Sequence, residues 1–240
     1  MPEVNFENNN VRITPLSDRS VLISFGNVID PSINERVLSI HKALLQNGFD
    51  GFIESVPAYA SLAVFYDVIK IQHSADFSAF LFVKEFLDSL VQRINSFEKP
   101  TSPIKVIPVC YDAEYGFDIT YVAGVHRLSI PEVISLHTSV IYRVYMIGFM
   151  PGFAYMGAVA DELATPRKDN AQLIVPAGSV GIAGAQTGIY PIDSPGGWQI
   201  IGRTPLRIFD VVNVNPCLLA AGDQVQFVSI DKNEFASYVD

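Results

Sequence analysis

Side chains that bind small anions and amides are concentrated between residues 142 and 203. Arginine presents a planar fork of N–H donors that matches a carboxylate or a phosphate. Hydroxyl groups and the glutamine amide can hydrogen-bond an amide or a lactam. The segment therefore predicts a groove for a small anionic or amide-bearing ligand. The candidate residues are Tyr142, Arg143, Arg167, Ser179, Gln186, Thr187, Tyr190, Trp198 and Arg203.

The turn at residues 194–198, SPGGW, is a second candidate element. Gly196 and Gly197 leave backbone amides uncovered, and such amides can form an anion-binding nest or an oxyanion-type donor pair. The alternative is a tight hairpin with Trp198 buried in the core, because an indole buries a large area in either case. The sequence leaves both interpretations open.

His137 is the strongest titratable candidate, because histidine alone titrates near neutral pH without perturbation. It falls in the last turn of a predicted helix, where it could transfer a proton or act as a C-cap. Ser179 follows VPAG without the GxSxG elbow of a nucleophile, which favours a hydrogen-bonding serine.

Motifs for nucleotide and metal binding are absent from the sequence. There is no Walker A sequence, no GxGxxG, no HExxH and no Cys/His cluster with metal-ligand spacing, so neither an ATP site nor a metal site is predicted within this chain alone. Cys110 and Cys217 lie in strand-like contexts and are predicted to be reduced, buried thiols.

The acidic balance of the chain restricts its partners. A net charge of −9 argues against nucleic acid, which needs a basic surface. The first residues lack a basic region followed by an apolar one, and no later stretch approaches the length of a membrane span. We therefore expect a cytoplasmic protein that binds neither nucleic acid nor membrane.

The elements that must position the candidate residues form a mainly-β domain over residues 104–240. From Tyr142 onward, short strand-like runs are broken by glycine and proline, a pattern typical of a sandwich or a closed barrel. Ser129 and Glu132 flank Pro131 as a capping-box pair and predict a short helix, SIPEVISLHTS. The glycine and proline between residues 148 and 205 specify irregular backbone, where binding chemistry usually lies.

Residues 1–95 predict a separate α+β domain. Strand pairs within residues 11–26 and 52–69 alternate with helices at about 31–47 and 77–94, and Asp30 can cap the first helix. This order suggests a ferredoxin-like fold. The polar, proline-containing segment at residues 96–103 predicts a linker between the domains.

Four strings in the second domain carry a family resemblance. They are GFMPGFAYMG at 148–157, TPR at 165–167, VPAGSVGIAGAQTGIYP at 175–191 and SPGGWQIIGRTP at 194–205. Together they resemble the kinase-inhibitor/allophanate-hydrolase-subunit-1 family, from about Ile104 to the C-terminus. The first 95 residues fit that family only through their length and α+β pattern. The resemblance implies a small α+β domain followed by a cyclophilin-like β-barrel.

The resemblance also implies a function. The chain would be one subunit of a multi-subunit, ATP-dependent 5-oxoprolinase that cleaves 5-oxo-L-proline to L-glutamate together with separate A and C subunits, with ATP shared with those partners. In that interpretation Arg167 and Arg203 stabilise carboxylate or phosphoryl charge, His137 assists proton transfer, and the turn at 194–198 donates backbone N–H groups.

One departure from the family pattern is visible. The family commonly repeats a Pro-Arg shortly after the first, but Ala171 and Gln172 stand at that place here. A second family arginine therefore cannot be carried over to this chain.

Other functions are implied by other members of the family. Some resemble inhibitors of a sporulation histidine kinase, and such a binding role is the main alternative. Carboxylase-linked urea-degrading enzymes contain related domains, but no biotin-carrier or carboxylase region is found up to Asp240. A peptidyl-prolyl isomerase role would rest on fold analogy alone, which is a weak argument.

Overall fold

The computed structural model describes residues 11–71, 78–94 and 103–238. They fall into two compact units, unit 1 within residues 1–100 and unit 2 within residues 101–240. The predicted linker at residues 96–103 lies, except for Pro103, outside the described residues. No helix in the described ranges is long and apolar enough to cross a membrane.

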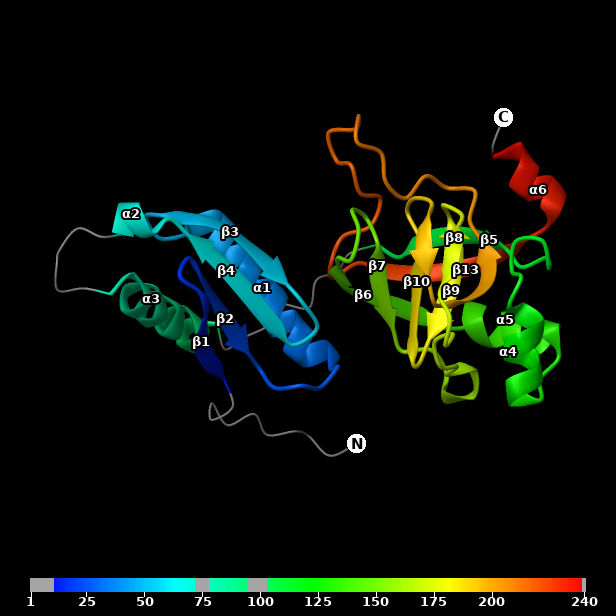
Figure 1. Cartoon of the computed structure of the whole chain (residues 1–240), viewed down its shortest axis with the longest axis horizontal. Coiled ribbons are helices and arrows are strands. Elements are labelled where there is room, and N and C mark those ends of the chain that lie inside the picture. The colour runs from blue at the N-terminus through cyan, green and yellow to red at the C-terminus, as the bar shows by residue number, and fades with distance from the viewer. Residues whose placement is uncertain (1–10, 72–77, 95–102, 239–240) are drawn as a thin grey trace. The chain divides into compact units, whose positions relative to one another are not determined.

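Unit 1 is a four-stranded antiparallel sheet with two long helices packed against it (Figure 1). The strands lie in the order β1-β2-β4-β3. Its elements are β1 (Arg12–Ser17), β2 (Ser20–Ser24), α1 (Pro31–Asn47), β3 (Phe52–Pro57), β4 (Ser61–Tyr66), α2 (Val68–Ile71) and α3 (Ala79–Arg93). The unit is α+β, as expected. Its element order begins with two strands, which differs from the β-α-β-β-α-β order of a ferredoxin-like fold, so that finer assignment stays a prediction.

Helix α1 forms where the sequence predicts it. The Asp30 carboxylate caps the helix by accepting the backbone N–H groups of Ser32 and Ile33. Hydrogen bonds, first from the Ser32 hydroxyl, lower the pKa of Asp30. The buried face of the helix consists of Asn34, Val37, Ile40 and Leu44, whose spacing of three or four residues is that of one helix face.

Unit 2 is a closed barrel of seven strands in the order β10-β7-β6-β13-β5-β12-β9. Of the two architectures predicted for this region, the closed barrel is the one observed. Its strands are β5 (Lys105–Cys110), β6 (Ile141–Ile147), β7 (Ala154–Gly157), β9 (Ser179–Ala183), β10 (Gln186–Ile189), β12 (Gln199–Arg203) and β13 (Gln224–Ile230). A separate two-stranded sheet pairs β8 (Gln172–Val175) with β11 (Ser194–Gly196).

Helices α4 (Ile119–His126) and α5 (Ile130–Thr138) pack their buried residues into the barrel core. The predicted capping box of α5 is present, since Ser129 and Glu132 exchange hydrogen bonds between side chain and backbone. Helix α4, the 3-10 turn η2 (Asp161–Leu163) and helix α6 (Lys232–Ser237) complete the unit. The sequence patterns above predict none of these three elements.

The barrel wall separates two apolar clusters, because successive side chains of a strand point to opposite faces. The inner core contains, among others, Val144, Met156, Val180, Ile182, Ile189 and Ile201. The outer cluster is formed by Phe153, Val175, Ala183, Tyr190, Trp198 and Ile200. Neighbours along β9, β10 and β12 therefore belong to different environments.

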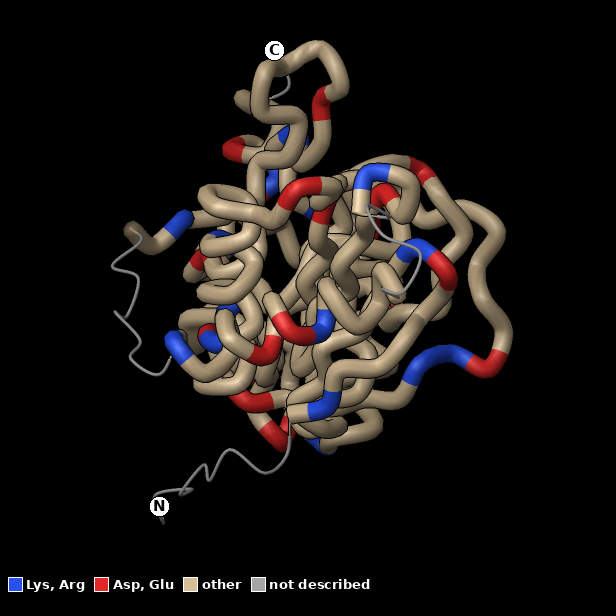
Figure 2. The backbone as a smooth tube through the Cα atoms, turned by 90° about the vertical axis from the view of Figure 1, so that its left-hand side faces the viewer, with Lys and Arg blue, Asp and Glu red and all other residues tan. Residues whose placement is uncertain are grey.

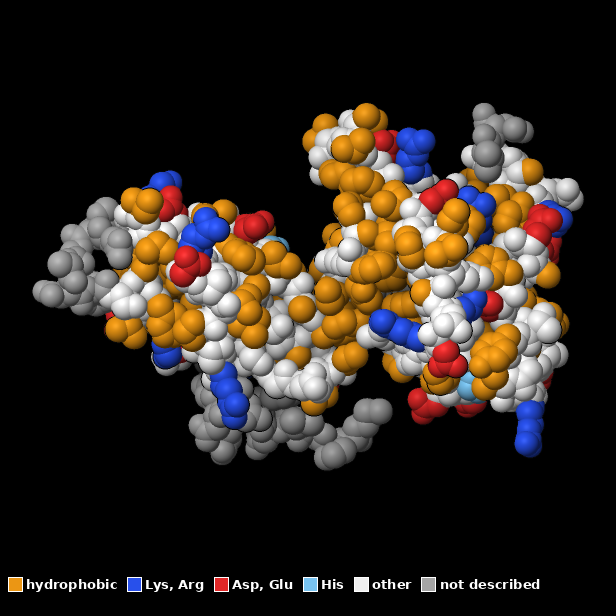
Figure 3. Space-filling view, in the orientation of Figure 1, with side chains coloured by type: hydrophobic (Ala, Val, Ile, Leu, Met, Phe, Trp, Pro, Cys, Tyr) orange, Lys and Arg blue, Asp and Glu red, His pale blue; other side chains and the backbone are white. Residues whose placement is uncertain are grey.

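The surface carries charges of both signs, and the loop at residues 210–218 exposes apolar side chains. Acidic and basic residues are scattered over the backbone in Figure 2, so the net charge of −9 is not gathered on one element. In the loop at residues 210–218, Val211, Val212 and Val214 are 79%, 84% and 99% exposed, and Figure 3 shows hydrophobic side chains at its tip. A backbone hydrogen bond of 2.8 Å from Asp210 to Pro216 closes the base of this loop.

Three of the predicted ligand-binding residues lie in the inner core. The His137 side chain is fully buried, with Nδ1 2.7 Å from the Tyr111 hydroxyl and Nε2 3.0 Å from the Thr187 hydroxyl. The Tyr142 hydroxyl donates to the His137 carbonyl oxygen at 3.0 Å, and the imidazole stacks on Phe227. Burial lowers the pKa of His137 to about 3, so the ring is neutral at pH 7. These positions do not fit the predicted contact with a ligand.

We expect the buried imidazole to make unit 2 sensitive to acid. Because the pKa of His137 is near 6.5 in the unfolded chain and about 3 in the folded one, the unfolded chain binds an extra proton between these values. The stability contributed by the neutral ring is complete above about pH 6.5 and is lost progressively as the pH falls toward 3. His137→Gln, which cannot titrate, is expected to flatten the dependence of Tm on pH in thermal unfolding between these limits.

The control is His126→Gln. His126 bonds the Thr165 hydroxyl at 3.0 Å and is only partly buried. This variant is expected to keep the acid sensitivity of the wild type. An equally flat profile in both variants, or a steep profile in both, would contradict the assignment to His137.

Candidate functional site

Two glycines on the outer wall of the barrel make room for Trp198. Gly181 on β9 and Gly188 on β10 lie directly opposite each other. A Cβ at Gly188 would lie 3.1 Å from the Trp198 ring and 2.9 Å from the Ala154 carbonyl oxygen, and one at Gly181 would lie 3.1 Å from the Trp198 Cβ. Trp198 is 5% exposed and is therefore buried. The strands on either side of the SPGGW turn do not form a hairpin, because β11 pairs with β8 and β12 pairs with β5 and β9.

An aromatic face surrounds this tryptophan, and we define it as Phe153, Tyr155, Tyr190, Trp198 and Arg167. The ring centroid of Phe153 lies 4.7 Å from Tyr155, 5.1 Å from Tyr190 and 5.3 Å from Trp198. The exposed Arg167 guanidinium lies 5.8 Å from the Trp198 ring centroid, within cation–π range. Burial raises the pKa values of Tyr155 and Tyr190, and the charge of Arg167 opposes this. Phe153, Tyr190 and Trp198 are at most 5% exposed, so the accessible part of the aromatic face is the exposed Arg167 with the half-buried Tyr155.

The loop that carries Arg167 is held on both sides. Lys168 Nζ forms an ion pair of 2.6 Å with Asp118, and the Lys168 N–H donates to the Gly197 carbonyl oxygen at 2.8 Å. The Gln199 amide donates to the carbonyl oxygen of the residue before the arginine at 3.0 Å. Both ionic side chains of the pair are at most 17% exposed. The backbone on both sides of Arg167 is therefore anchored, while the guanidinium itself is exposed.

Asp118 is a positioning residue that the sequence patterns do not reveal. Its carboxylate also accepts the Ile200 N–H at 2.7 Å, so one side chain joins the start of α4, strand β12 and the loop of Lys168. In the sequence, an acid before an apolar segment indicates at most an N-cap, and Asp118 makes no cap hydrogen bond. Only the tertiary pairing shows its role.

Arg143 and Gln186 lie on either side of Gly157, which pairs with both through the register of β6, β7 and β10. Both side chains are half-buried and hold contacts within the chain. A Cβ at Gly157 would meet no atom closer than 3.5 Å. The structure therefore brings these two predicted residues into one row, and the Tyr145 ring lies in van der Waals contact over the glycine between them.

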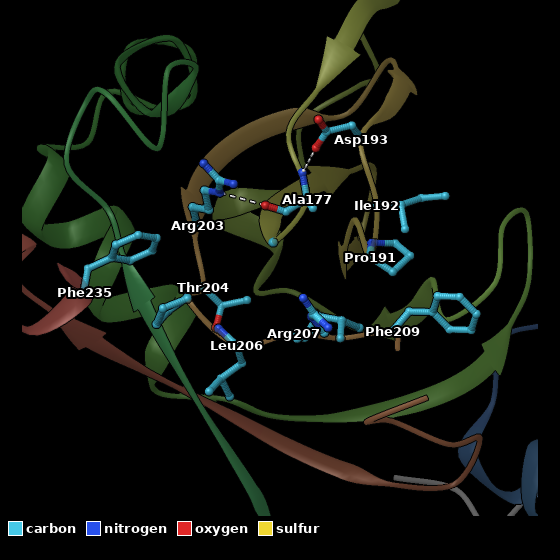
Figure 4. Close-up of a pocket in the computed structure, with 13 residues that line it drawn as sticks. Ala177, Pro191, Ile192, Asp193, Arg203, Thr204, Leu206, Arg207, Phe209 and Phe235 are labelled. Atoms are coloured by element: carbon cyan, nitrogen blue, oxygen red, sulfur yellow. Dashed lines mark hydrogen bonds between the residues drawn. The ribbon is translucent and has the colours of Figure 1, made fainter. Parts of the chain in front are cut away.

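Arg203 lines a separate pocket of about 580 Å³, at the end of β12 remote from Trp198. Its Nε donates to the Ala177 carbonyl oxygen at 2.7 Å, and the Asp193 carboxylate accepts the Ala177 N–H at 2.7 Å (Figure 4). Ser179 lies opposite Arg203 in the β9–β12 register. The Ser179 hydroxyl is buried and has no hydrogen-bond partner among the described residues.

The predicted site residues thus occupy separate places instead of one groove. His137, Tyr142 and Thr187 are in the inner core. The outer wall holds Arg143, Arg167, Gln186, Tyr190, Gly196, Gly197 and Trp198, and the pocket region holds Ser179 and Arg203. In the part of the chain that the structure describes, no group of three or more His, Cys, Asp or Glu residues could hold a metal ion.

Comparison with known proteins identifies the family of this chain. Residues 11–219 match the carboxyltransferase domain, subdomain C and D. The chain belongs to this family. The match covers both units, so the family assignment extends beyond the second-domain strings that carry the resemblance in the sequence.

The alignments to related proteins and solved structures extend over almost the whole chain. The chain is 42% identical to the B subunit of 5-oxoprolinase from Bacillus subtilis (strain 168) over 230 residues, which are 95% of this chain and 96% of that protein. The crystal structure of TTHA0988 is 34% identical with a TM-score of 0.78, and it matches 89% of this chain and 40% of its own. The conserved uncharacterized protein PH0987 from Pyrococcus horikoshii is 46% identical with a TM-score of 0.54, over 93% of this chain and 100% of its own.

The glycine at position 188 is expected to be required for the aromatic face. Gly188→Ala places a Cβ against the Trp198 ring and the Ala154 carbonyl oxygen, and such overpacking typically costs about 1–3 kcal/mol. We expect a lower Tm and a changed emission of the single tryptophan. Gly124→Ala is the matched control, because nothing lies within 4 Å of its added Cβ. Equal stability of the two variants would contradict the packing argument.

Proposed function

We propose that this protein is the B subunit of an ATP-dependent 5-oxoprolinase, which cleaves 5-oxo-L-proline to L-glutamate in the cytoplasm. The observation that carries the proposal is the 42% identity to the B subunit of a 5-oxoprolinase over 95% of this chain and 96% of that protein. An alignment over nearly the whole of both chains is stronger evidence for a shared role than a similar fold would be, because one fold can host many functions. The partners are then the A and C subunits.

The reaction must open a lactam, which is unreactive toward water. ATP supplies phosphoryl transfer to the lactam oxygen, and its site is shared with the partner subunits because this sequence contains no Walker A or GxGxxG motif. Arg167 is exposed, and the residues before and after it are anchored by Gln199 and Asp118. Its guanidinium is placed to stabilise carboxylate or phosphoryl charge that a partner surface brings to the aromatic face.

His137 is proposed to position strand β10 and to take no part in proton transfer. A general base must come within hydrogen-bond reach of its substrate, whereas both His137 nitrogens bond buried hydroxyls. The Thr187 hydroxyl that contacts His137 also donates to the Gly181 carbonyl oxygen at 3.0 Å. The histidine therefore supports the two strands on which Trp198 lies.

For unit 1 we infer a relationship to the ferredoxin-like fold. Strands β2, β4 and β3 with helices α1 and α3 follow the order of the first three strands and two helices of that fold. Strand β1 lies beside β2, at the place that the fourth strand would take. Unit 2 is proposed to be cyclophilin-like, supported by its closed barrel.

Reconstitution tests the proposed function. We expect ATP-dependent formation of glutamate from 5-oxo-L-proline when this chain is co-expressed with its A and C subunits, and none without it. Arg167→Gln is expected to lower kcat/KM by about 10- to 100-fold, since a hydrogen bond to a charged group contributes about 1.5–3 kcal/mol. Arg127→Asn, at an exposed arginine with φ of 57°, is the control. Equal activity without this chain would contradict the proposal.

The loop at residues 210–218 supports a role in an assembly. It projects three exposed valines from a base closed by a backbone hydrogen bond, and such an apolar surface suits a contact with another subunit. An inhibitor of a histidine kinase, the alternative function, would need an exposed apolar surface as well. Kinase binding by the wild type, without any requirement for this chain in glutamate formation, would favour the alternative.

Substitution of two valines tests the loop. Val212→Ser with Val214→Ser is expected to weaken co-purification with the A and C subunits by at least about tenfold, because each buried valine side chain contributes about 1.5 kcal/mol or more. The Tm is expected to stay unchanged. Ile69→Ser, at a position 84% exposed in unit 1, is the control. Full retention of the partners by the double variant would exclude this loop as the contact.

A further inference from the structure

The side chain of Arg203 enters its pocket with most of its donors unused. The residue is half-buried, and its Nε donates to the Ala177 carbonyl oxygen at 2.7 Å. Among the described residues, this is its one hydrogen bond, and no carboxylate forms an ion pair with it. The other N–H groups of the guanidinium are therefore available to a ligand.

The other charged side chains of the pocket already have partners. Arg207 Nη1 lies 3.0 Å from the Asp210 carboxylate, and the Asp193 carboxylate accepts the Ala177 N–H. A half-buried cation without a counter-charge is unfavourable. An anion bound at Arg203 would remove this cost.

The turn beneath Arg203 is built to hold its orientation. Gly178 has a φ of +81°, and a Cβ there would collide with the Thr204 carbonyl oxygen. The Gly178 N–H donates to the Tyr190 carbonyl oxygen at 2.7 Å, and the Thr204 N–H donates to the Gly178 carbonyl oxygen at 2.9 Å. The Ala177 carbonyl that orients the guanidinium is thus fixed, and a preorganised donor binds its ligand at lower entropic cost.

A second unpaired polar group lies in the same part of the wall. Ser179 is directly opposite Arg203 in the strand register, and residues opposite each other share one face of a sheet. Its hydroxyl is buried without a partner in the described part of the chain. Ser179 does not line the pocket and its hydroxyl has almost no exposed surface, so the contact with a ligand in the pocket is assigned to Arg203 alone.

The remaining walls of the pocket are apolar and include Pro191, Ile192, Leu206, Phe209 and Phe235. We propose that the pocket binds a small organic acid, with its carboxylate on Arg203 and its hydrocarbon part against these side chains. Arg203 is the guanidinium of the pocket without an ion pair, and the Asp193 carboxylate also lines the pocket, which favours a monoanion over a polyphosphate. The choice of 5-oxo-L-proline as the first member of this class rests on the proposed function.

Titration calorimetry on the isolated full-length chain tests the pocket with four probes, which are 5-oxo-L-proline, L-glutamate, 2-pyrrolidinone and inorganic phosphate. 2-Pyrrolidinone has the same lactam ring without the carboxylate. We expect saturable binding of 5-oxo-L-proline and no saturable binding of 2-pyrrolidinone. Arg203→Gln is expected to weaken binding at least tenfold, whereas Arg127→Asn leaves it unchanged.

Ile192→Trp provides a second variant, because it fills the pocket while Arg203 stays in place. It is expected to lose binding with an unchanged Tm, which keeps the test valid if Arg203→Gln unfolds. Equal binding of 2-pyrrolidinone, binding of phosphate alone, undiminished binding in both variants, or no saturable binding of any probe would overturn the proposal. Reconstituted glutamate formation with an unchanged KM in Arg203→Gln would overturn the pocket and leave the proposed function standing.

Discussion

Closure of seven strands into a barrel is the constraint on which unit 2 depends. It forces the side chains of each strand to alternate between a sealed interior and an outer wall. Thr187 therefore faces His137 inside, while its neighbour Gly188 faces Trp198 outside. One residue step along β10 separates a core contact from the aromatic face. This alternation places some of the polar residues predicted to converge inside the barrel and others on its outer wall, so they cannot line one groove.

The outer layer depends in turn on a pair of half-buried charges. The Asp118 carboxylate forms an ion pair with the Lys168 ammonium and accepts a hydrogen bond from the Ile200 N–H. A pair with little exposure is costly to desolvate and gains from added hydrogen bonds, and the backbone donor of β12 supplies one. The geometry of the loop therefore follows from the barrel strand and not from the loop's own composition. This explains how an exposed Arg167 can be positioned on irregular backbone.

The sequence predicts features that depend on neighbours in the chain. Asp30 caps α1 and Ser129 forms its capping box because each needs only residues two or three positions away. Helix α4 escapes prediction because Gly124 and several β-branched residues weaken its helical pattern. The burial of His137 could not be predicted, since its position in a helix end does not reveal that the helix points it into the barrel. The pocket of Arg203 depends on a strand register that no local pattern contains.

The positions of the two candidate arginines limit what this chain can do by itself. The Arg167 guanidinium lies 5.8 Å from the ring centroid of Trp198, which precedes β12, whereas Arg203 is the last residue of that strand. Arg167 does not line the pocket of Arg203, so of the two cations only Arg203 is placed to contact a ligand in that pocket. Arg203 is half-buried beside a pocket, whereas Arg167 is exposed at an open surface. The enclosed cation suits a ligand held by this chain, and the exposed one suits charge that another surface must deliver, which is the division expected of one subunit in a composite enzyme.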